Sequence, residues 1–237
     1  MLLSLSVASE SISPLWIQIS LVAVWILLIA LAAWLVWRLG SDDSEVIRKI
    51  VHIGTGNVIL LAWWLDMPAI IGIVASVIAS AVMLLSYRFP ILPGINSVGR
   101  QSLGTFFYSV SIGILIAWFW NIQQPQYAVL GVLVMAWGDG LAALIGRRFG
   151  KNKYEVFGGQ KSLEGSATMA VVTFTVSFLV SIFVSGNFWQ AALVSTIVAV
   201  ITTALETFSL LGIDNLTVPL GSATLAYILD RLTQGIG

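Results

Sequence analysis

The sequence contains no cysteine and a single histidine, His52, among its 237 residues. Without thiols the chain can form no disulfide, no zinc–thiolate site and no thiolate nucleophile, and one imidazole cannot build the usual histidine clusters that hold transition metals. Any bound metal must therefore be held by oxygen ligands, which favours Mg²⁺ or a similar hard cation.

Charged residues are also scarce. They make up 9% of the chain, against roughly 25% in soluble proteins, while 58% of the residues are hydrophobic. With a mean hydropathy of +0.97, this composition predicts an integral membrane protein. The net charge is zero, and there is no basic tail or basic aromatic groove, so we expect no nucleic-acid partner.

Apolar runs long enough to cross a bilayer recur along the whole chain. A transmembrane helix needs about 20 residues to span a ~30 Å hydrocarbon core. The sequence therefore predicts an all-α, polytopic transmembrane bundle of seven to eight helices in one domain, residues 1–237, with an N-terminal helix in 1–40 and the rest of the bundle in 46–235. Because residues 1–14 lack the lysine or arginine that begins a signal peptide, we expect the first helix to be retained. The expected spans are residues 15–37, 50–65, 68–87, 103–120, 127–145, 166–184, 189–211 and a shorter 218–232.

Lysine and arginine fall in alternate connections between these spans. The first, third and fifth connections carry them, and the second, fourth and sixth have none. By the positive-inside rule the odd-numbered connections are cytoplasmic and the N-terminus lies outside. The turn before the last span then also lies inside, so we expect an active site at the cytoplasmic face. The cations that set this orientation are Arg38, Arg48, Lys49, Arg88, Arg100, Arg147, Arg148, Lys151, Lys153 and Lys161.

The fifth span contains a lone carboxylate, Asp139. A charge inside a membrane segment costs several kcal/mol to solvate and is by default a sign of function. Asp139 and Arg147 share one helical face, so a structural ion pair between them is one interpretation. We favour a metal ligand or general base. The small residues Gly138, Ala142, Gly146 and Gly150 recur every four positions and predict close packing against a neighbouring helix.

The connection after this span, residues 151–166, is short, basic and rich in glycine. Such a segment can bind phosphate through lysine side chains, backbone N–H groups and the N-terminus of the next helix. It is not a P-loop, because Gln160 stands where that motif has glycine and no strand precedes it. An ordinary positive-inside loop is the alternative. Glu164, three residues after Lys161, could bring a second carboxylate to a metal.

Further polar residues lie where lipid alone would not favour them. In the second span His52 is equally well explained as a packed neutral side chain or as a phosphate contact, and in the seventh Glu206 is either a structural partner of a basic residue or a ligand contact. Arg100 is a weaker candidate. The expected substrate- and nucleotide-binding residues are Arg48, Lys49, His52, Asn57, Arg100, Arg147, Arg148, Glu206 and Asn215.

Four segments resemble one known family, in that family's order. They are RKIVHIGTG (48–56), GDGLAALIGRRFG (138–150), KSLEGS (161–166) and DNLTVPL (214–220). These are similar to the signatures of the membrane phytol and dolichol kinases, the CTP-dependent polyprenol kinases, which are related to phosphatidate cytidylyltransferases. The pattern most resembles the phytol kinases of cyanobacteria and plastids.

The resemblance implies transfer of the γ-phosphate of CTP, or another nucleoside triphosphate, to the hydroxyl of phytol or a related isoprenoid alcohol, for use in tocopherol or chlorophyll side chains. It also implies a multi-pass protein of a bacterial inner or thylakoid-type membrane. The catalytic residues would be Asp139, Lys161 and Glu164, and Mg²⁺ would be held by Asp139, Glu164 and Asp214. Which carboxylate accepts the proton stays open, as does the oligomeric state.

Two other functions remain open from the residues. A related enzyme would join CTP to a lipid as a cytidylyltransferase and release pyrophosphate. A cation-coupled transporter would use intramembrane carboxylates to bind ions or protons, although that function would leave the basic connection at 151–166 unexplained.

Overall fold

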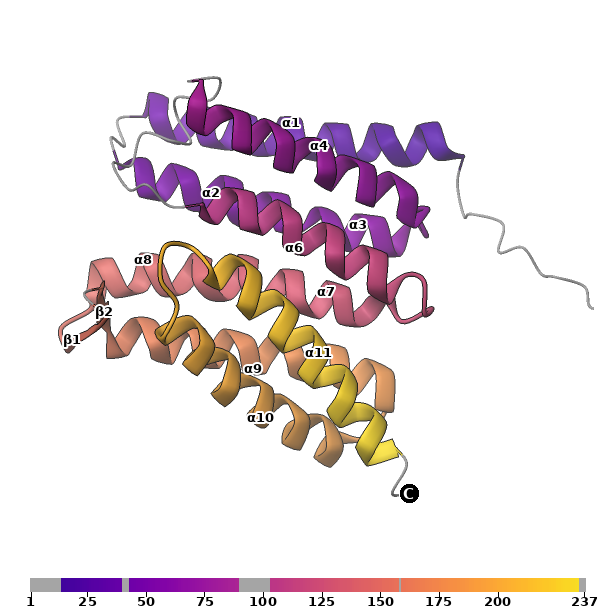
Figure 1. Ribbon diagram of the computed structural model, residues 1–237, viewed down its shortest axis with the longest axis vertical. Coiled ribbons are helices and arrows are strands. Elements are labelled where there is room, and N and C mark those ends of the chain that lie inside the picture. The colour runs from indigo at the N-terminus through magenta and orange to yellow at the C-terminus, as the bar shows by residue number, and fades with distance from the viewer. Residues whose placement is uncertain (1–13, 40–42, 90–102, 158, 235–237) are drawn as a thin grey trace, which may run out of the picture.

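A computed structural model describes residues 14–39, 43–89, 103–157 and 159–234. Within these ranges the chain forms ten α-helices, one π-helical segment and one β-hairpin (Figure 1). The elements are α1 (Leu15–Arg38), α2 (Ser44–Gly56), α3 (Val58–Trp64), α4 (Ala69–Arg88), α6 (Gly104–Phe119), α7 (Pro125–Leu133), η1 (Val134–Asp139), α8 (Gly140–Phe149), β1 (Lys153–Val156), β2 (Gly159–Ser162), α9 (Leu163–Ser185), α10 (Phe188–Thr207) and α11 (Asp214–Gln234).

The helices form rods, with α2–α3 as one rod and α7–η1–α8 as another. Successive rods are antiparallel and run from side to side in Figure 1. Six rods in the described part of the chain are long and apolar enough to cross a membrane, and α6 is a shorter apolar helix. The predicted polytopic helical bundle is therefore confirmed, with six rather than seven or eight spans meeting this criterion. The six are Leu15–Arg38, Ser44–Trp64, Ala69–Tyr87, Pro125–Phe149, Leu163–Ser185 and Phe188–Thr207.

The rod α7–η1–α8 forms the centre of the bundle. Val134, Met135 and Ala136 are completely buried, whereas α1 exposes most of its apolar side chains. Glycine helps this burial: a Cβ at Gly131 would collide with the backbone carbonyl of Pro219 on α11, so only glycine permits this approach of α7 to α11. The predicted continuous helix at 127–145 is wrong in one respect, because the π-helical segment η1 interrupts it.

The connection at 151–166 contains a small antiparallel sheet that the all-α prediction omitted. Strand β1 pairs with β2 in a register that places Lys153 opposite Ser162 and Tyr154 opposite Lys161. Each strand has four residues, mostly polar, so neither gives the alternating apolar pattern by which a half-buried strand is recognised. At the turn, Phe157 adopts a positive φ of 48°.

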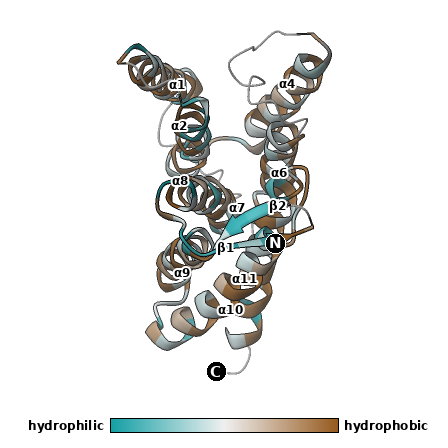
Figure 2. Cartoon of the chain, turned by 90° about the vertical axis from the view of Figure 1, so that its left-hand side faces the viewer, coloured by the Kyte–Doolittle hydropathy of each residue, from teal (hydrophilic) through white to brown (hydrophobic). Residues whose placement is uncertain are grey.

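Most polar ends of the rods meet at one end of the bundle, which we call the hairpin end. It carries β1 and β2, the first turns of α2 and α11, and the last turns of α8 and α10 (Figure 1). Figure 2 views the molecule from this end, with the hydrophilic hairpin in front. This clustering agrees with the alternating distribution of cations along the sequence.

The small residues of η1 and α8 pack against α9 and the residue before it, as predicted. Gly138 lies against Met169, and Gly146 lies against Ser162 and Gly165. The Ser162 hydroxyl also caps α9, because it accepts a hydrogen bond of 3.1 Å from the Gly165 backbone N–H. The close approach therefore fixes the hairpin and the start of α9 against α8.

We expect Gly146→Leu to lower the free energy of unfolding by about 1–3 kcal/mol, because overpacking forces this interface apart. A Cβ at Gly146 would already lie 2.9 Å from the Ser162 hydroxyl. Thermal unfolding in detergent would show the effect as a lower Tm. Gly159→Leu is the matched control, since a Cβ there meets nothing closer than 3.4 Å; equal Tm values for the two variants would contradict the prediction.

Candidate functional site

The centre of the candidate site is an ion pair between Lys49 on α2 and Asp139 at the end of η1. The Lys49 ammonium also donates to the Asp139 backbone carbonyl, at 3.3 Å. The Lys49 side chain is 1% exposed and that of Asp139 is 16% exposed. A buried ion pair is stable only where the two charges are in close contact and further hydrogen bonds satisfy their remaining polar atoms. Here the lysine is enclosed, while the carboxylate keeps a surface that a ligand can contact.

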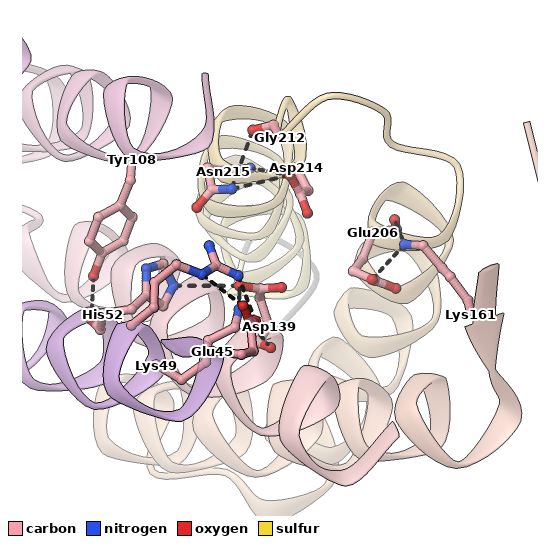
Figure 3. Close-up of polar contacts among 11 residues, drawn as sticks. Glu45, Lys49, His52, Tyr108, Asp139, Lys161, Glu206, Gly212, Asp214 and Asn215 are labelled. Atoms are coloured by element: carbon pink, nitrogen blue, oxygen red, sulfur yellow. Dashed lines mark hydrogen bonds and ion pairs between the residues drawn. The ribbon is translucent and has the colours of Figure 1, made fainter. Parts of the chain in front are cut away.

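His52 lies one turn further along α2, with its side chain directed at the same carboxylate. Its Nε2 atom is 3.6 Å from Asp139 Oδ2 and is buried, with no hydrogen-bond partner among the described residues. The ring packs against that of Tyr108 on α6, with centroids 4.3 Å apart and planes tilted by 34°, and the Tyr108 hydroxyl donates to the His52 carbonyl at 3.1 Å. Tyr108 therefore holds His52 so that a polar atom is left available beside Asp139 (Figure 3).

The π-helical segment η1 determines how Asp139 is presented. Such segments are rare and occur frequently at functional sites, because the wider turn redirects the side chains that follow it. The backbone of Met135, inside η1, interacts with the His52 side chain. One irregular turn thus contributes both the carboxylate and a support for the histidine.

The start of α11 faces this centre. Asp214 interacts electrostatically with Asp139, Lys161 and Lys49, which places a second carboxylate within reach of the ion pair. Its position is fixed by Asn215, whose side-chain amide donates to Asp214 Oδ1 at 3.1 Å and to the Gly212 carbonyl at 3.3 Å. The structure therefore brings together the predicted residues of α2, η1 and α11 (Figure 3).

Arg48 extends the positive charge of this centre. Its guanidinium binds Glu45 through two hydrogen bonds, of 3.0 and 2.6 Å, and it also interacts electrostatically with Asp139 and Asp214. Glu45 was not among the residues expected at this site. Its position three residues before Arg48 puts the two side chains on one helical face, and this spacing could have predicted the ion pair.

Lys161 lies on β2 and pairs with α10. Its ammonium donates to Glu206 Oε1 at 2.6 Å and to the Glu206 backbone carbonyl. Glu206 is therefore the structural partner of a basic residue, one of the two roles that the sequence left open. The ion pair attaches the hairpin to the last turn of α10. This pair is set apart from the Asp139 centre in Figure 3, with Asp214 interacting electrostatically with Lys161.

Glu164 has a different environment from the one expected of it. Its carboxylate accepts hydrogen bonds from the backbone N–H groups of Lys151 and Asn152, at 3.1 and 3.2 Å, and from the Asn152 side chain. No described contact joins it to Lys161, Asp139 or Asp214. The catalytic and metal-binding roles of Glu164 stay predictions, and its visible role is to close the base of the hairpin.

The other predicted binding residues have local partners. Asn57 accepts a 2.9 Å hydrogen bond from the Trp137 indole, and Arg148 lies over the Phe149 ring. Arg147 forms an ion pair with Asp43, at 3.1 Å, and not with Asp139. Desolvation alone would raise the pKa of Asp43. The hydrogen bonds that its carboxylate accepts from the Glu45 N–H and from Arg147 outweigh desolvation, so the pKa of Asp43 is lowered. Arg100 lies outside the described residues.

The sequence is similar to several proteins that are named phytol or farnesol kinases. It is 49% identical over 222 residues to the phytol kinase of Synechocystis sp. (strain ATCC 27184 / PCC 6803 / Kazusa), a match that covers 94% of this chain and 95% of that protein. The chain belongs to the phytol kinase family. It is also 30% identical over 213 residues to the chloroplastic farnesol kinase of Arabidopsis thaliana, covering 80% of this chain and 67% of that protein.

A further family member, the chloroplastic phytol kinase 1 of Arabidopsis thaliana, is 27% identical over 210 residues, covering 78% of this chain and 67% of that protein. No family model and no solved structure matches the chain. Membership of the family confirms the resemblance drawn from the four short motifs. Together with the six candidate spans, it identifies the chain as a multi-pass integral membrane protein.

Proposed function

We propose that this chain is a kinase that transfers the γ-phosphate of CTP, or of another nucleoside triphosphate, to the hydroxyl of phytol or a related isoprenoid alcohol. The identity of 49% to a phytol kinase, over nearly the whole of both chains, supports the acceptor. The observation that carries the proposal is the Lys49–Asp139 pair, with the unpartnered Nε2 of His52 and the Asp214 carboxylate beside it.

The chain's own groups fit each part of a phosphoryl transfer. The alcohol oxygen attacks the γ-phosphorus, the bond to the β-phosphate oxygen breaks, and the nucleoside diphosphate leaves with its electron pair. Asp139 is proposed to accept the alcohol's proton, since Lys49 fixes the orientation of its carboxylate. His52 Nε2, 3.6 Å from the same carboxylate, is placed to hydrogen-bond the alcohol.

Mg²⁺ fits the carboxylates of this site. In the described part of the chain no group of three or more His, Asp or Glu side chains could hold a metal by itself. Proteins commonly bind Mg²⁺ through one or two carboxylates together with substrate phosphates. Asp139 and Asp214 would hold the ion, and it would neutralise charge on the phosphates.

The nucleotide is proposed to enter from the hairpin end. Lys161 and Arg48 supply positive charge there, and phosphate oxygens accept strong hydrogen bonds from such cations. The positive-inside rule supports a cytoplasmic location for this end, with the N-terminus on the opposite side. CTP is proposed as the donor on the strength of the family resemblance alone.

Purified protein supplied with phytol and with CTP labelled separately at the α- and γ-phosphates would test this function. We expect γ-label in phytyl phosphate and α-label in released CDP. Entry of α-label into the lipid would instead identify a cytidylyltransferase. Cation-dependent uptake into proteoliposomes without nucleotide turnover would identify a transporter.

A further inference from the structure

An apolar cavity of about 270 Å³ lies between α1, α2–α3, α4 and α6. Thr55 and Gly56 line one end of it, and Met67 and Trp120 line the other. The Trp120 indole donates a 3.2 Å hydrogen bond to the Met67 carbonyl, which holds the far end together. In Figure 2, α1 with α2 and α4 with α6 form the two limbs on either side of this region.

The near end of the cavity adjoins the phosphoryl-transfer site. A Cβ on Gly56 would lie 2.7 Å from the Tyr108 hydroxyl and would collide with Ala136, so glycine is required at this junction. Thr55, which lines the cavity, donates a 3.1 Å hydrogen bond to the His52 carbonyl, the same atom that Tyr108 binds. The cavity therefore ends one helical turn from the histidine that faces Asp139.

The size and lining of the cavity select among apolar occupants. Small-molecule pockets measure about 300–1,000 Å³, so this cavity of about 270 Å³ is a small one and encloses part of one hydrocarbon chain, not two chains. Its walls carry several small side chains, among them Ala62, Ala75 and Ala79. Gaps beside small side chains accept the methyl branches of an isoprenoid, whereas lipid tails are already solvated by other tails and gain little from burial alone.

We propose that this cavity binds the chain of the isoprenoid alcohol, with its hydroxyl at the Thr55–Gly56 end facing His52 and Asp139 and its tail toward Trp120. This assignment rests on the proposed function, whose acceptor it locates. Under this assignment the residues of α4 and α6 that line the cavity determine which lengths of alcohol the protein accepts, because a longer alcohol reaches further toward Trp120.

Ala75→Phe tests the assignment, because Ala75 is exposed and lines the cavity, so a larger ring fills the space without breaking a buried contact. We expect at least a tenfold rise in KM for phytol, a smaller rise for the shorter farnesol, and no change in KM for CTP. Ala81→Phe is the matched control: it lies on the same helix, is exposed, and is outside the lining. Equal KM values for phytol in the two variants would overturn the assignment.

A direct binding measurement separates this inference from the proposed function. Wild-type protein in vesicles is labelled with a phytol analogue that carries a diazirine on its tail, and the labelled peptides are mapped. Labelling of α3, α4 and α6 that excess phytol displaces supports the cavity, even if no alcohol is phosphorylated, in which case the kinase proposal fails alone. The cavity assignment is overturned if other helices are labelled, or if phospholipid displaces the label as effectively as phytol does. Neither outcome affects the kinase proposal, which the phosphorylation assay tests separately.

Discussion

Asp139→Asn is expected to reduce phytol phosphorylation by about 10²–10⁴-fold, the usual contribution of a positioned acid or base. Asparagine has nearly the same shape, but it carries no negative charge and cannot accept the alcohol's proton. It also removes one of the two carboxylates that fit Mg²⁺. Turnover of phytol by purified protein at saturating CTP measures the effect.

A control must separate chemistry from folding, because Lys49 is 1% exposed and would lose its counter-charge in this variant. Breaking a buried ion pair from one side costs about 3–5 kcal/mol, whereas replacing both partners is often neutral. The double variant Lys49→Met/Asp139→Asn should therefore recover much of the lost Tm and remain inactive. Near-normal turnover by the single variant would remove Asp139 from the mechanism.

The sequence was sufficient to find Asp139 but not its partner. A carboxylate within an apolar span stands out by composition alone, and the order of four short motifs was enough to indicate the family. Arg48 and Lys49 are adjacent and were equal candidates. Neighbouring residues on a helix point in directions about 100° apart, so only the packing of α2 against η1 decides that Lys49 meets Asp139 while Arg48 binds Glu45.

Sequence spacing was misleading where a helix boundary intervened. Lys161 and Glu164 stand three positions apart, which would make them neighbours on one helix. However, β2 ends at Ser162 and α9 begins at Leu163, so the two side chains belong to different elements. Lys161 instead reaches Glu206, 45 positions away. Such long-range pairs depend on how the rods pack together, so they cannot be predicted from local sequence patterns.

Lys161→Ala is expected to raise the KM for CTP by about 10–100-fold, since a charge-assisted hydrogen bond contributes roughly 1.5–3 kcal/mol and 1.4 kcal/mol corresponds to a factor of ten. The side chain is 22% exposed, so a phosphate can contact the ammonium while Glu206 holds it. Steady-state kinetics with CTP varied at saturating phytol measure the change. Lys153→Ala is the matched control, an exposed lysine on the other strand of the same hairpin.

The contact with Glu206 offers a purely structural role for Lys161, which predicts a different result. If Lys161 only anchors the hairpin to α10, then both Lys161→Ala and Glu206→Gln should lower Tm and leave the KM for CTP unchanged. Lys161→Ala should lower Tm at least as much, because it also loses the hydrogen bond to the Glu206 backbone carbonyl. If Lys161 binds phosphate, Glu206→Gln frees the ammonium and should affect the KM for CTP much less than Lys161→Ala does. Both variants remove the ion pair, but Lys161→Ala also removes the hydrogen bond to the Glu206 backbone carbonyl. A rise in the KM for CTP in Lys161→Ala alone, with a Tm close to that of Glu206→Gln, therefore comes from the contact that Lys161 makes with the nucleotide.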